Sequence, residues 1–513
     1  MHEIIYLQMG GLSNYIGTHF WNTQDVYSDE EAAQEVSWSI RHNNRGEQFF
    51  HPRVMIFDYR ENLGNLRGNS IENEGDDRIG EETPVETWNE RLQVLQQPEI
   101  PPSRYQAQFD REDRGATGET EPQDEEAMLS EWKSPEPADI RYWSDFNHVN
   151  YAPYSIHPLT TWTRRQLEGS QNKSAVTWIE GKDAFTQYDK DTEFMDTALR
   201  QLTEECDSFQ GFQGLIESKS FGGFNSMISE RIAEEHPKRV TIDFVILTAT
   251  ATGQPRMDMA KDSSILSNIL TLHSSLHFSS IAVPLLAFED WHSGGWKRLV
   301  PGLKSDSYSM SAIYSGMIES CTWPIRRVKA GREAESLVSH LNSNGKIPFA
   351  SLEGLLAPLE SFKPEEEIDG FILNLSSYER DRHRHTGILA SYSVARGIPK
   401  TTLSLMQNSR EPRLRERNDT NPYPLPISHP RLFCSPDGAQ VLSSVPIYSS
   451  LRVEPAVSDV LSTHLNWGER YMKGGDLTVT GLERDEFIEV LESLRAAKEH
   501  YCSAAADDSD QEE

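Results

Sequence analysis

Two short segments carry residue types that could hold a phosphate group. In the first, Gly10 and Gly11 follow the apolar run 3–8. Ser13 and Asn14 come directly after the two glycines. Backbone N–H groups in such a turn, and at the N-terminus of the helix behind it, attract anions because they carry partial positive charge. Since a turn in any α/β protein has similar residues, this motif alone leaves a phosphate site and an ordinary turn as alternatives.

The second segment is ESKSFGG at 217–223, which we expect to form a loop before a helix that begins near Phe224. Serine hydroxyls, a lysine and glycines suit phosphate binding, although the GxxxxGK[ST] spacing of a P-loop is absent. A helix cap followed by a turn explains these residues equally well. The candidate phosphate contacts in this segment are Ser218, Ser220, Gly222 and Gly223.

Other reactive side chains form no recognisable catalytic group. The sequence contains no GxSxG, HExxH or CxxC motif. In RHRH at 382–385 the neighbouring arginines would repel a cation, so we expect a solvated loop rather than a metal site. Four widely spaced cysteines predict reduced thiols rather than a disulfide framework. These observations favour a protein that is not an enzyme and that holds no metal ion.

Composition and charge exclude several classes of partner. The chain has 513 residues, of which 80 are acidic and 49 basic, for a formal charge of −31. That excess of negative charge argues against binding a nucleic-acid backbone or an anionic membrane surface. No run approaches the roughly 20 apolar residues of a membrane span. The N-terminus also lacks the layout of a secretion signal or an import presequence, so we expect a cytosolic protein.

Periodicity predicts the elements that would position the two segments. The apolar runs 3–8, 53–58 and 240–247 are typical of strands in a sheet that is covered on both faces. A helix is expected over 13–21, directly after the first glycine pair. Strand, glycine turn, helix and strand in this order indicate a doubly wound, mostly parallel α/β sheet.

A strongly acidic segment interrupts this pattern. Residues 72–136 hold 19 acidic and 6 basic residues, 6 prolines and only 4 aromatic residues. Such a segment buries too little apolar surface to offset the entropy of ordering it. We therefore expect a disordered insert over 70–138.

The remaining chain divides into further regions. We expect an N-terminal nucleotide-binding-type domain over 1–260, a core helix over 261–278 and a second α/β domain over 279–450. A C-terminal helical region is expected over 451–505 and an acidic tail over 506–513.

The ordered segments together resemble the tubulin/FtsZ superfamily. MHEIIYLQMGGLSNYIGTHFW is similar to the start of tubulins, where a strand leads into a nucleotide-contacting turn and a helix ending in FW. HPRVMIFDYRENLGNLR at 51–67 resembles the segment that ends in Val-Asp-Leu-Glu-Pro-Gly in tubulins. ECDSFQGFQ at 205–213 and SERIAEEHPKRVTIDFVI at 229–246 resemble the stretches on either side of the tubulin phosphate loop. The resemblance implies a tubulin-like fold and makes GTP the candidate cofactor.

Three positions depart from the tubulin pattern. IESKSFGGF at 216–224 stands where tubulins have the phosphate-binding GGGTGSG. Gly11 stands at the position of the tubulin glutamine, and Arg60 aligns with the glutamate that tubulins use near the magnesium–nucleotide site. An acidic side chain such as Glu217 is unfavourable beside a triphosphate. These departures argue against nucleotide hydrolysis of the tubulin type.

A more specific resemblance is to the Misato family of divergent tubulin relatives. WNTQD at 21–25, RYWSDF at 141–146, EECDSFQGFQ at 204–213 and the acidic insert are all similar to that family. This resemblance implies a role in mitochondrial distribution and morphology and in mitochondrial DNA inheritance. For animal relatives it implies a connection with tubulin, the spindle and the cytosolic chaperonin.

Three functional hypotheses follow. The first is a non-catalytic organiser of mitochondrial partitioning, located in the cytoplasm and peripherally on the cytosolic face of mitochondria, that binds mitochondrial-surface proteins. The second is a GTP-binding switch or a filament-forming GTPase that uses the eight candidate contacts named above. The third is a tubulin-assembly factor that works with tubulin and the cytosolic chaperonin.

Overall fold

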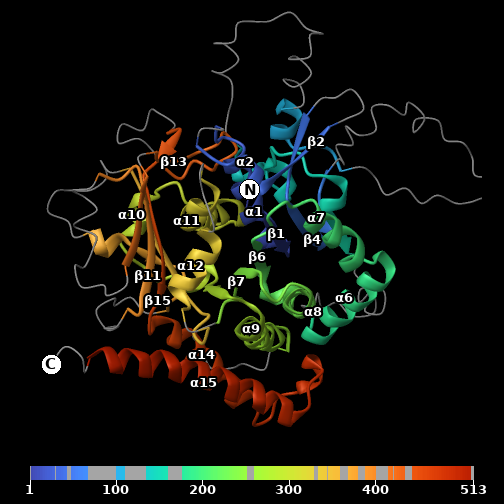
Figure 1. The fold of residues 1–513 in the computed structure, drawn as a ribbon, viewed down its shortest axis with the longest axis vertical. Coiled ribbons are helices and arrows are strands. Elements are labelled where there is room, and N and C mark those ends of the chain that lie inside the picture. The colour runs from blue at the N-terminus through green and yellow to red at the C-terminus, as the bar shows by residue number, and fades with distance from the viewer. Residues whose placement is uncertain are drawn as a thin grey trace, which may run out of the picture.

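The computed structural model describes most of the chain outside the acidic insert. The described residues are 2–28, 31–42, 48–66, 100–109, 135–159, 176–250, 259–327, 333–343, 345–358, 368–378, 388–399, 414–419, 421–433 and 442–509. They form two large sheets with helices between and around them, together with the two-stranded pairs β2-β3 and β13-β14 (Figure 1).

The N-terminal sheet has six strands in the order β5-β4-β1-β6-β7-β8, and every neighbouring pair is parallel. Its central strands are buried along almost their whole length, as expected for continuous apolar runs. This confirms the doubly wound parallel sheet that the sequence predicts. The strands are β1 Ile4–Met9, β4 Val54–Tyr59, β5 Ile156–Leu159, β6 Gly211–Glu217, β7 Val240–Ile246 and β8 Ile281–Leu285.

Helices cover both faces of this sheet. Alternate residues of β1 explain how: Ile4 and Tyr6 share a core with helix α1 (Gly11–Gln24), whereas Ile5 and Leu7 share a core with helix α8 (Ser218–Glu235). Helices α6 (Trp178–Thr192) and α9 (Met259–Phe278) flank α8. The expected core helix 261–278 therefore corresponds to α9.

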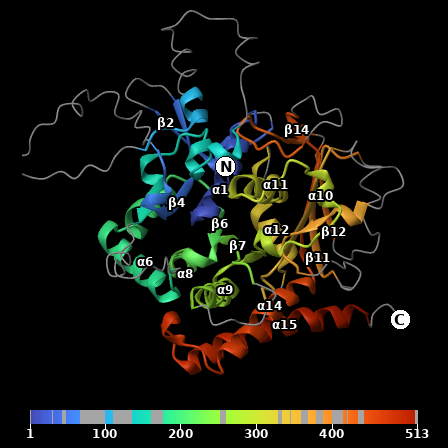
Figure 2. The same cartoon turned by 180° about the vertical axis from the view of Figure 1, so that it is seen from behind.

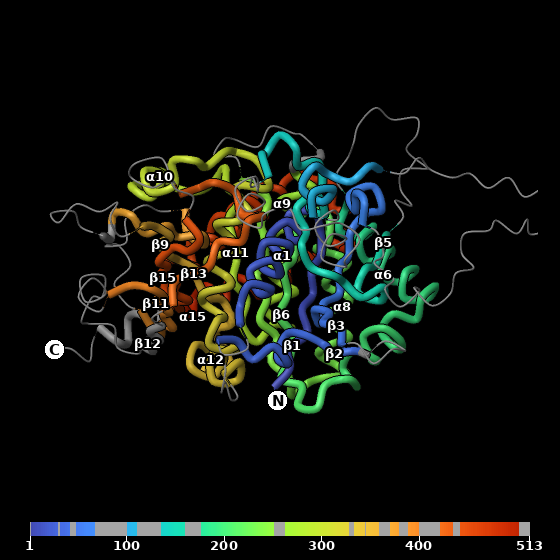
Figure 3. Tube along the Cα trace, turned by 90° about the horizontal axis from the view of Figure 1, so that it is seen from above, coloured from blue at the N-terminus to red at the C-terminus, as the bar shows by residue number. Residues whose placement is uncertain are grey.

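The second sheet has five strands in the order β10-β9-β15-β11-β12. Only β11 and β12 are parallel, so this sheet is mixed. Helix α11 (Ser307–Arg326) packs on it and also lies beside α1, between the two sheets (Figure 3). The strands are β9 Ser351–Leu356, β10 Leu373–Asn374, β11 Ala390–Arg396, β12 Leu414–Asp419 and β15 Ile447–Val453.

Two C-terminal helices run across one end of both sheets (Figure 1 and Figure 2). Helix α14 (Ala456–Tyr471) and helix α15 (Arg484–Ser509) pack on each other and on α9. Helix α15 extends into the segment expected as an acidic tail. The shorter elements are α2 Gln34–Ser37, β2 Trp38–His42, β3 Gln48–Pro52, α7 Arg200–Glu204, α10 Trp296–Leu299, α12 Glu333–Leu341, β13 Tyr423–Pro424 and β14 Ser444–Val445.

A buried ionic group joins the two halves of the molecule. Glu319 of α11 accepts hydrogen bonds from Arg396 of β11 at 2.8 Å and from Arg326 at 3.3 Å. Tyr27, just after α1, donates to the same carboxylate at 3.0 Å. All three charged side chains are at most 1% exposed. Such a group needs every partner in place because a buried unpaired charge is strongly unfavourable.

Two expectations are corrected. Helix α8 begins at Ser218 rather than near Phe224, so the expected loop 217–223 is the first part of a helix. Within the expected disordered insert, residues 100–109 are described and include a helical turn. Ser103 donates a hydrogen bond to the carbonyl of Asp145, and Tyr105 is buried, so tertiary contacts hold this part of the insert in place.

Candidate functional site at the start of helix α1

The turn between β1 and α1 requires glycine. Gly10 has a φ of 105°, a region that other L-residues rarely adopt. A Cβ atom on Gly10 would lie 2.7 Å from the Cβ of Glu217 and 2.8 Å from its Oε2. Gly10 therefore lets the end of β6 approach the first turn of α1 closely.

Glu217 uses this close approach to bind the N-terminus of α1. Its Oε2 accepts a hydrogen bond from the backbone N–H of Leu12 at 3.1 Å. The first N–H groups of a helix have no partner within the helix and favour a negative charge. Burial raises the pKa of Glu217, the hydrogen bond from Leu12 lowers it, and the nearby Asp58 raises it again. A side chain of the protein thus occupies an anion-binding position at the start of α1.

Asp58 is a second buried carboxylate at this edge of the sheet. It is the last buried residue of β4 and accepts hydrogen bonds from Asn14 Nδ2 at 2.9 Å and Trp143 Nε1 at 3.1 Å. Asn62 Nδ2 and the N–H of Tyr59 both donate to its other oxygen at 2.8 Å. Burial raises the pKa of Asp58, and these four donors oppose that effect. The four hydrogen bonds fix the carboxylate in position.

Two polar atoms beside the turn lack partners among the described residues. They are Oγ of Ser13 and Oδ1 of Asn14, and both side chains are fully buried. A buried polar atom without a partner is uncommon and marks a place where water or a ligand group could bind. The sequence-predicted contacts on the α1 side, Gly10, Gly11, Ser13 and Asn14, therefore gather at one place.

The predicted contacts on the α8 side serve close helix packing. A Cβ on Gly222 would lie 2.3 Å from Thr271 Oγ1 of α9, and one on Gly223 would lie 2.1 Å from the carbonyl oxygen of Trp178 of α6. Ser218 is buried, and its Oγ donates to Asn268 Oδ1 of α9 at 2.6 Å. Three of these side-chain positions therefore face neighbouring helices.

Ser220 differs from the other three predicted contacts on α8. Its side chain is half-buried, and its carbonyl oxygen accepts a hydrogen bond from the hydroxyl of Tyr59 at 3.5 Å. This contact joins the first turn of α8 to the end of β4.

This arrangement places a carboxylate of the protein where an anion could bind. The carboxylate of Glu217 already lies on the start of α1, and a fixed helix replaces the glycine loop. Sequence reasoning identified the turn and the acidic character of Glu217 but missed its hydrogen bond to Leu12 and the carboxylate of Asp58. The sequence contained one signal that could have indicated this pair of carboxylates. Asp58 and Glu217 both lie at the ends of parallel strands, and such ends meet at one edge of a sheet.

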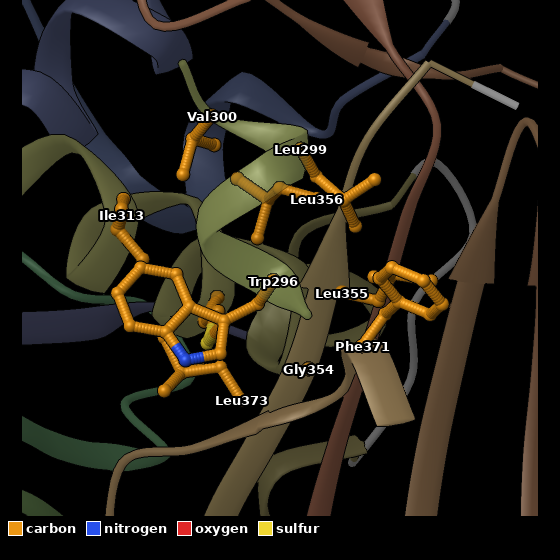
Figure 4. A pocket seen from close by; sticks show the side chains of 10 residues that line it. Trp296, Leu299, Val300, Ile313, Gly354, Leu355, Leu356, Phe371 and Leu373 are labelled. Atoms are coloured by element: carbon orange, nitrogen blue, oxygen red, sulfur yellow. The ribbon is translucent and has the colours of Figure 1, made fainter. Parts of the chain in front are cut away.

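Among the described residues of the second half, an apolar pocket lies beside a larger pocket of mixed character. The one in Figure 4 has a volume of about 20 Å³, which is room for a water molecule only. Trp296 and Phe371 lie on two sides of it. A neighbouring pocket of about 280 Å³ shares Trp296 and also includes Trp291 and Lys297. Its lining also includes the hydroxyl-bearing Ser305.

Two further results concern metal clusters and membrane-spanning helices among the described residues. Nowhere in the described ranges do three or more His, Cys, Asp or Glu side chains gather in a way that would hold a metal ion. Among the same residues, no helix combines the length and apolar composition needed to cross a membrane. The RHRH segment at 382–385 lies outside the described residues.

Two models of protein families match this chain, and each covers one of the two segments that form the site. A model of the Misato segment II tubulin-like domain matches residues 2–111, which include the β1–α1 turn. A tubulin domain model matches residues 133–327, which include Glu217 and α8.

Fungal proteins named DML1 or dml-1 are similar over most of the chain. The Gibberella zeae protein is 28% identical over 76% of each chain. The Neurospora crassa protein is 30% identical over 72% of this chain and 64% of its own length. The Coccidioides immitis protein is 26% identical over 89% of this chain and 90% of its own.

Proposed function

Because this chain belongs to the Misato family of tubulin-like proteins, we propose that it acts in mitochondrial distribution, morphology and partitioning and in the inheritance of mitochondrial DNA. In this proposal it is a non-catalytic organiser that works by binding other proteins. It is located in the cytoplasm and peripherally on the cytosolic face of mitochondria. The family resemblance supports the biological role, and the geometry at the start of α1 supports the non-catalytic mode of action.

The hydrogen bond from Leu12 to Glu217 is the observation that carries the non-catalytic part of the proposal. A phosphate at the same N-terminus would face this carboxylate. Two unit charges 4 Å apart repel by about 4 kcal/mol at an effective dielectric constant of 20. A bound triphosphate would have to displace the side chain or protonate it. The internal carboxylate gives α1 a stable start without a nucleotide.

The packing of α8 supports the same conclusion. Gly222 and Gly223 allow α8 to lie directly against α9 and α6, so the segment that would enclose phosphates is part of the helical core. A tubulin-like fold that is complete without a nucleotide can offer its outer surfaces to protein partners.

The test is GTP titration into the purified full-length protein with Mg²⁺, together with mass spectrometry of any co-purified nucleotide. We expect no bound nucleotide and no binding at millimolar GTP. Glu217→Gln removes the negative charge and should raise any residual phosphate affinity, whereas Glu230→Gln, at an exposed position of the same helix, should not. Micromolar binding by the unaltered protein would overturn the proposal and favour a GTP-binding switch or a filament-forming GTPase.

A second experiment distinguishes the partners. Affinity capture with the full-length chain, followed by mass spectrometry, should recover proteins of the mitochondrial surface. Fluorescent tagging should place the protein on mitochondria, and its depletion should disturb mitochondrial partitioning. Recovery of tubulin and the cytosolic chaperonin alone, without a mitochondrial phenotype, would favour a tubulin-assembly factor instead.

A further inference from the structure

Helix α9 carries two histidines on one face, one turn apart, close to its C-terminal end. Nε2 of His273 and Nε2 of His277 lie 3.1 Å apart. The ring centroids are 4.6 Å apart and the ring planes meet at 69°. His277 is exposed and His273 is half-buried, so solvent reaches the pair. The two Nε2 atoms thus lie next to each other, within reach of solvent.

The distance between the two nitrogens matches the spacing needed to chelate a metal ion. With Zn–N bonds of about 2.0–2.1 Å, an ion placed equally far from both Nε2 atoms would see them at an angle of about 100°. That angle lies between the ideal tetrahedral and octahedral values. Imidazole nitrogen is a preferred ligand of Zn²⁺, Cu²⁺ and Ni²⁺. The pair can therefore bind such an ion without moving the backbone.

A side chain of helix α15 lies beside the pair. From helix α15, the hydroxyl oxygen of Ser493 lies 3.3 Å from Nε2 of His277.

We propose that His273 and His277 form a bidentate site for a divalent transition-metal ion of the zinc class. Water fills the remaining coordination positions, and Ser493 of α15 lies beside the ion. The site has two protein ligands, so it binds more weakly than a structural zinc site with four. The bound ion connects two successive turns of α9 at the place where α15 packs on it.

The test is calorimetric titration of ZnCl₂ into the full-length protein, after treatment with a chelator and transfer to a non-coordinating buffer. We expect one ion per chain with micromolar affinity. His273→Ala and His277→Ala should each abolish this binding, whereas His2→Ala, at the start of the N-terminal sheet, should leave it unchanged. Circular dichroism checks that each variant is folded.

A gain of affinity provides an independent check. Ser493→His places a third imidazole next to Nε2 of His277 and should tighten zinc binding by about tenfold or more, because three nitrogen ligands then hold the ion. Co²⁺ bound to that variant should show the visible absorption of a tetrahedral site. Absence of heat with millimolar zinc, or binding that persists in both alanine variants, would overturn the proposal. The test uses neither GTP binding nor partner binding, so its outcome is independent of the proposed function.

Discussion

At the scale of single residues, Asp243 has an environment that makes the stability of the N-terminal sheet depend on pH. It lies in the middle of β7 and is buried, and the hydroxyl of Ser279 donates a hydrogen bond to its Oδ2 at 2.6 Å. Burial raises the pKa of Asp243 to about 6, and the bond from Ser279 opposes the shift. The folded protein therefore holds a proton on this carboxyl more tightly than the unfolded chain does.

The direction of the pH dependence follows from this difference in proton affinity between the folded and the unfolded protein. The favourable contribution of the protonated carboxyl is fully present below pH 3.8 and is lost as the pH rises through about 6. Asp243→Asn keeps an acceptor for Ser279 and carries no charge. We expect it to raise the free energy of unfolding at pH 7.5 by up to about 3 kcal/mol, and to have little effect at pH 3.5.

Urea unfolding of the Asp243→Asn variant and the unaltered protein at a series of pH values measures this difference. Asp183→Asn, at an exposed position on α6, is the matched control and should give the same unfolding midpoint as the unaltered protein throughout. A stability difference that is equal at pH 3.5 and pH 7.5 would show that Asp243 does not titrate as described.

At the scale of elements, the two glycines of α8 distinguish packing from phosphate binding. The carbonyl oxygen of Trp178, part of the α6 backbone, lies 2.1 Å from the position of a Cβ on Gly223. The corresponding neighbour of Gly222 is the side-chain hydroxyl of Thr271, which can rotate more easily. We expect Gly223→Ala to lower the free energy of unfolding by about 1–3 kcal/mol, and Gly222→Ala to lower it by less.

Thermal and urea unfolding measure both changes, and Gly474→Ala is the control. No atom lies within 4 Å of a Cβ on Gly474, so that substitution should leave stability nearly unchanged. If the glycines contacted phosphates instead, the double change at Gly222 and Gly223 would abolish GTP affinity and leave the unfolding midpoint where it was.

The element scale also shows how far the sequence could predict the structure. Continuous apolar runs predicted β1, β4 and β7 because strands covered on both faces need them. The start of α8 was missed because serine and glycine are typical of loops, and here contacts with α9 and α6 outweigh that preference. The bond from Leu12 to Glu217 joins residues 205 positions apart, and no local pattern could indicate it.

At the scale of the whole molecule, the buried group around Glu319 holds the two sheets in one arrangement. Glu319→Gln would remove the negative charge that Arg326 and Arg396 share. Removing one partner of a buried charge group typically lowers the free energy of unfolding by about 3–5 kcal/mol. We expect a loss of that size for Glu319→Gln, measured by urea unfolding.

The control for this prediction is an exposed ion pair. Glu204 binds Arg200 at 2.8 Å on the surface of the N-terminal half, so Glu204→Gln should change stability very little. A double-mutant cycle that combines Glu319→Gln with Arg396→Met should recover part of the loss. Equal effects of the two glutamate changes would mean that the buried group does not hold the sheets together.

The position of α1 between the two sheets has a consequence for the order in which the protein can form. Its side chains form hydrogen bonds with residues that are synthesised much later. His19 pairs with Tyr308, Thr23 with Tyr423, and Asn22 with Ser428, which is 406 positions away. At roughly 5–20 residues per second of synthesis, about 20–80 s pass before Ser428 has been added to the chain. During that interval the first long helix to be made lacks the surroundings that finally enclose it.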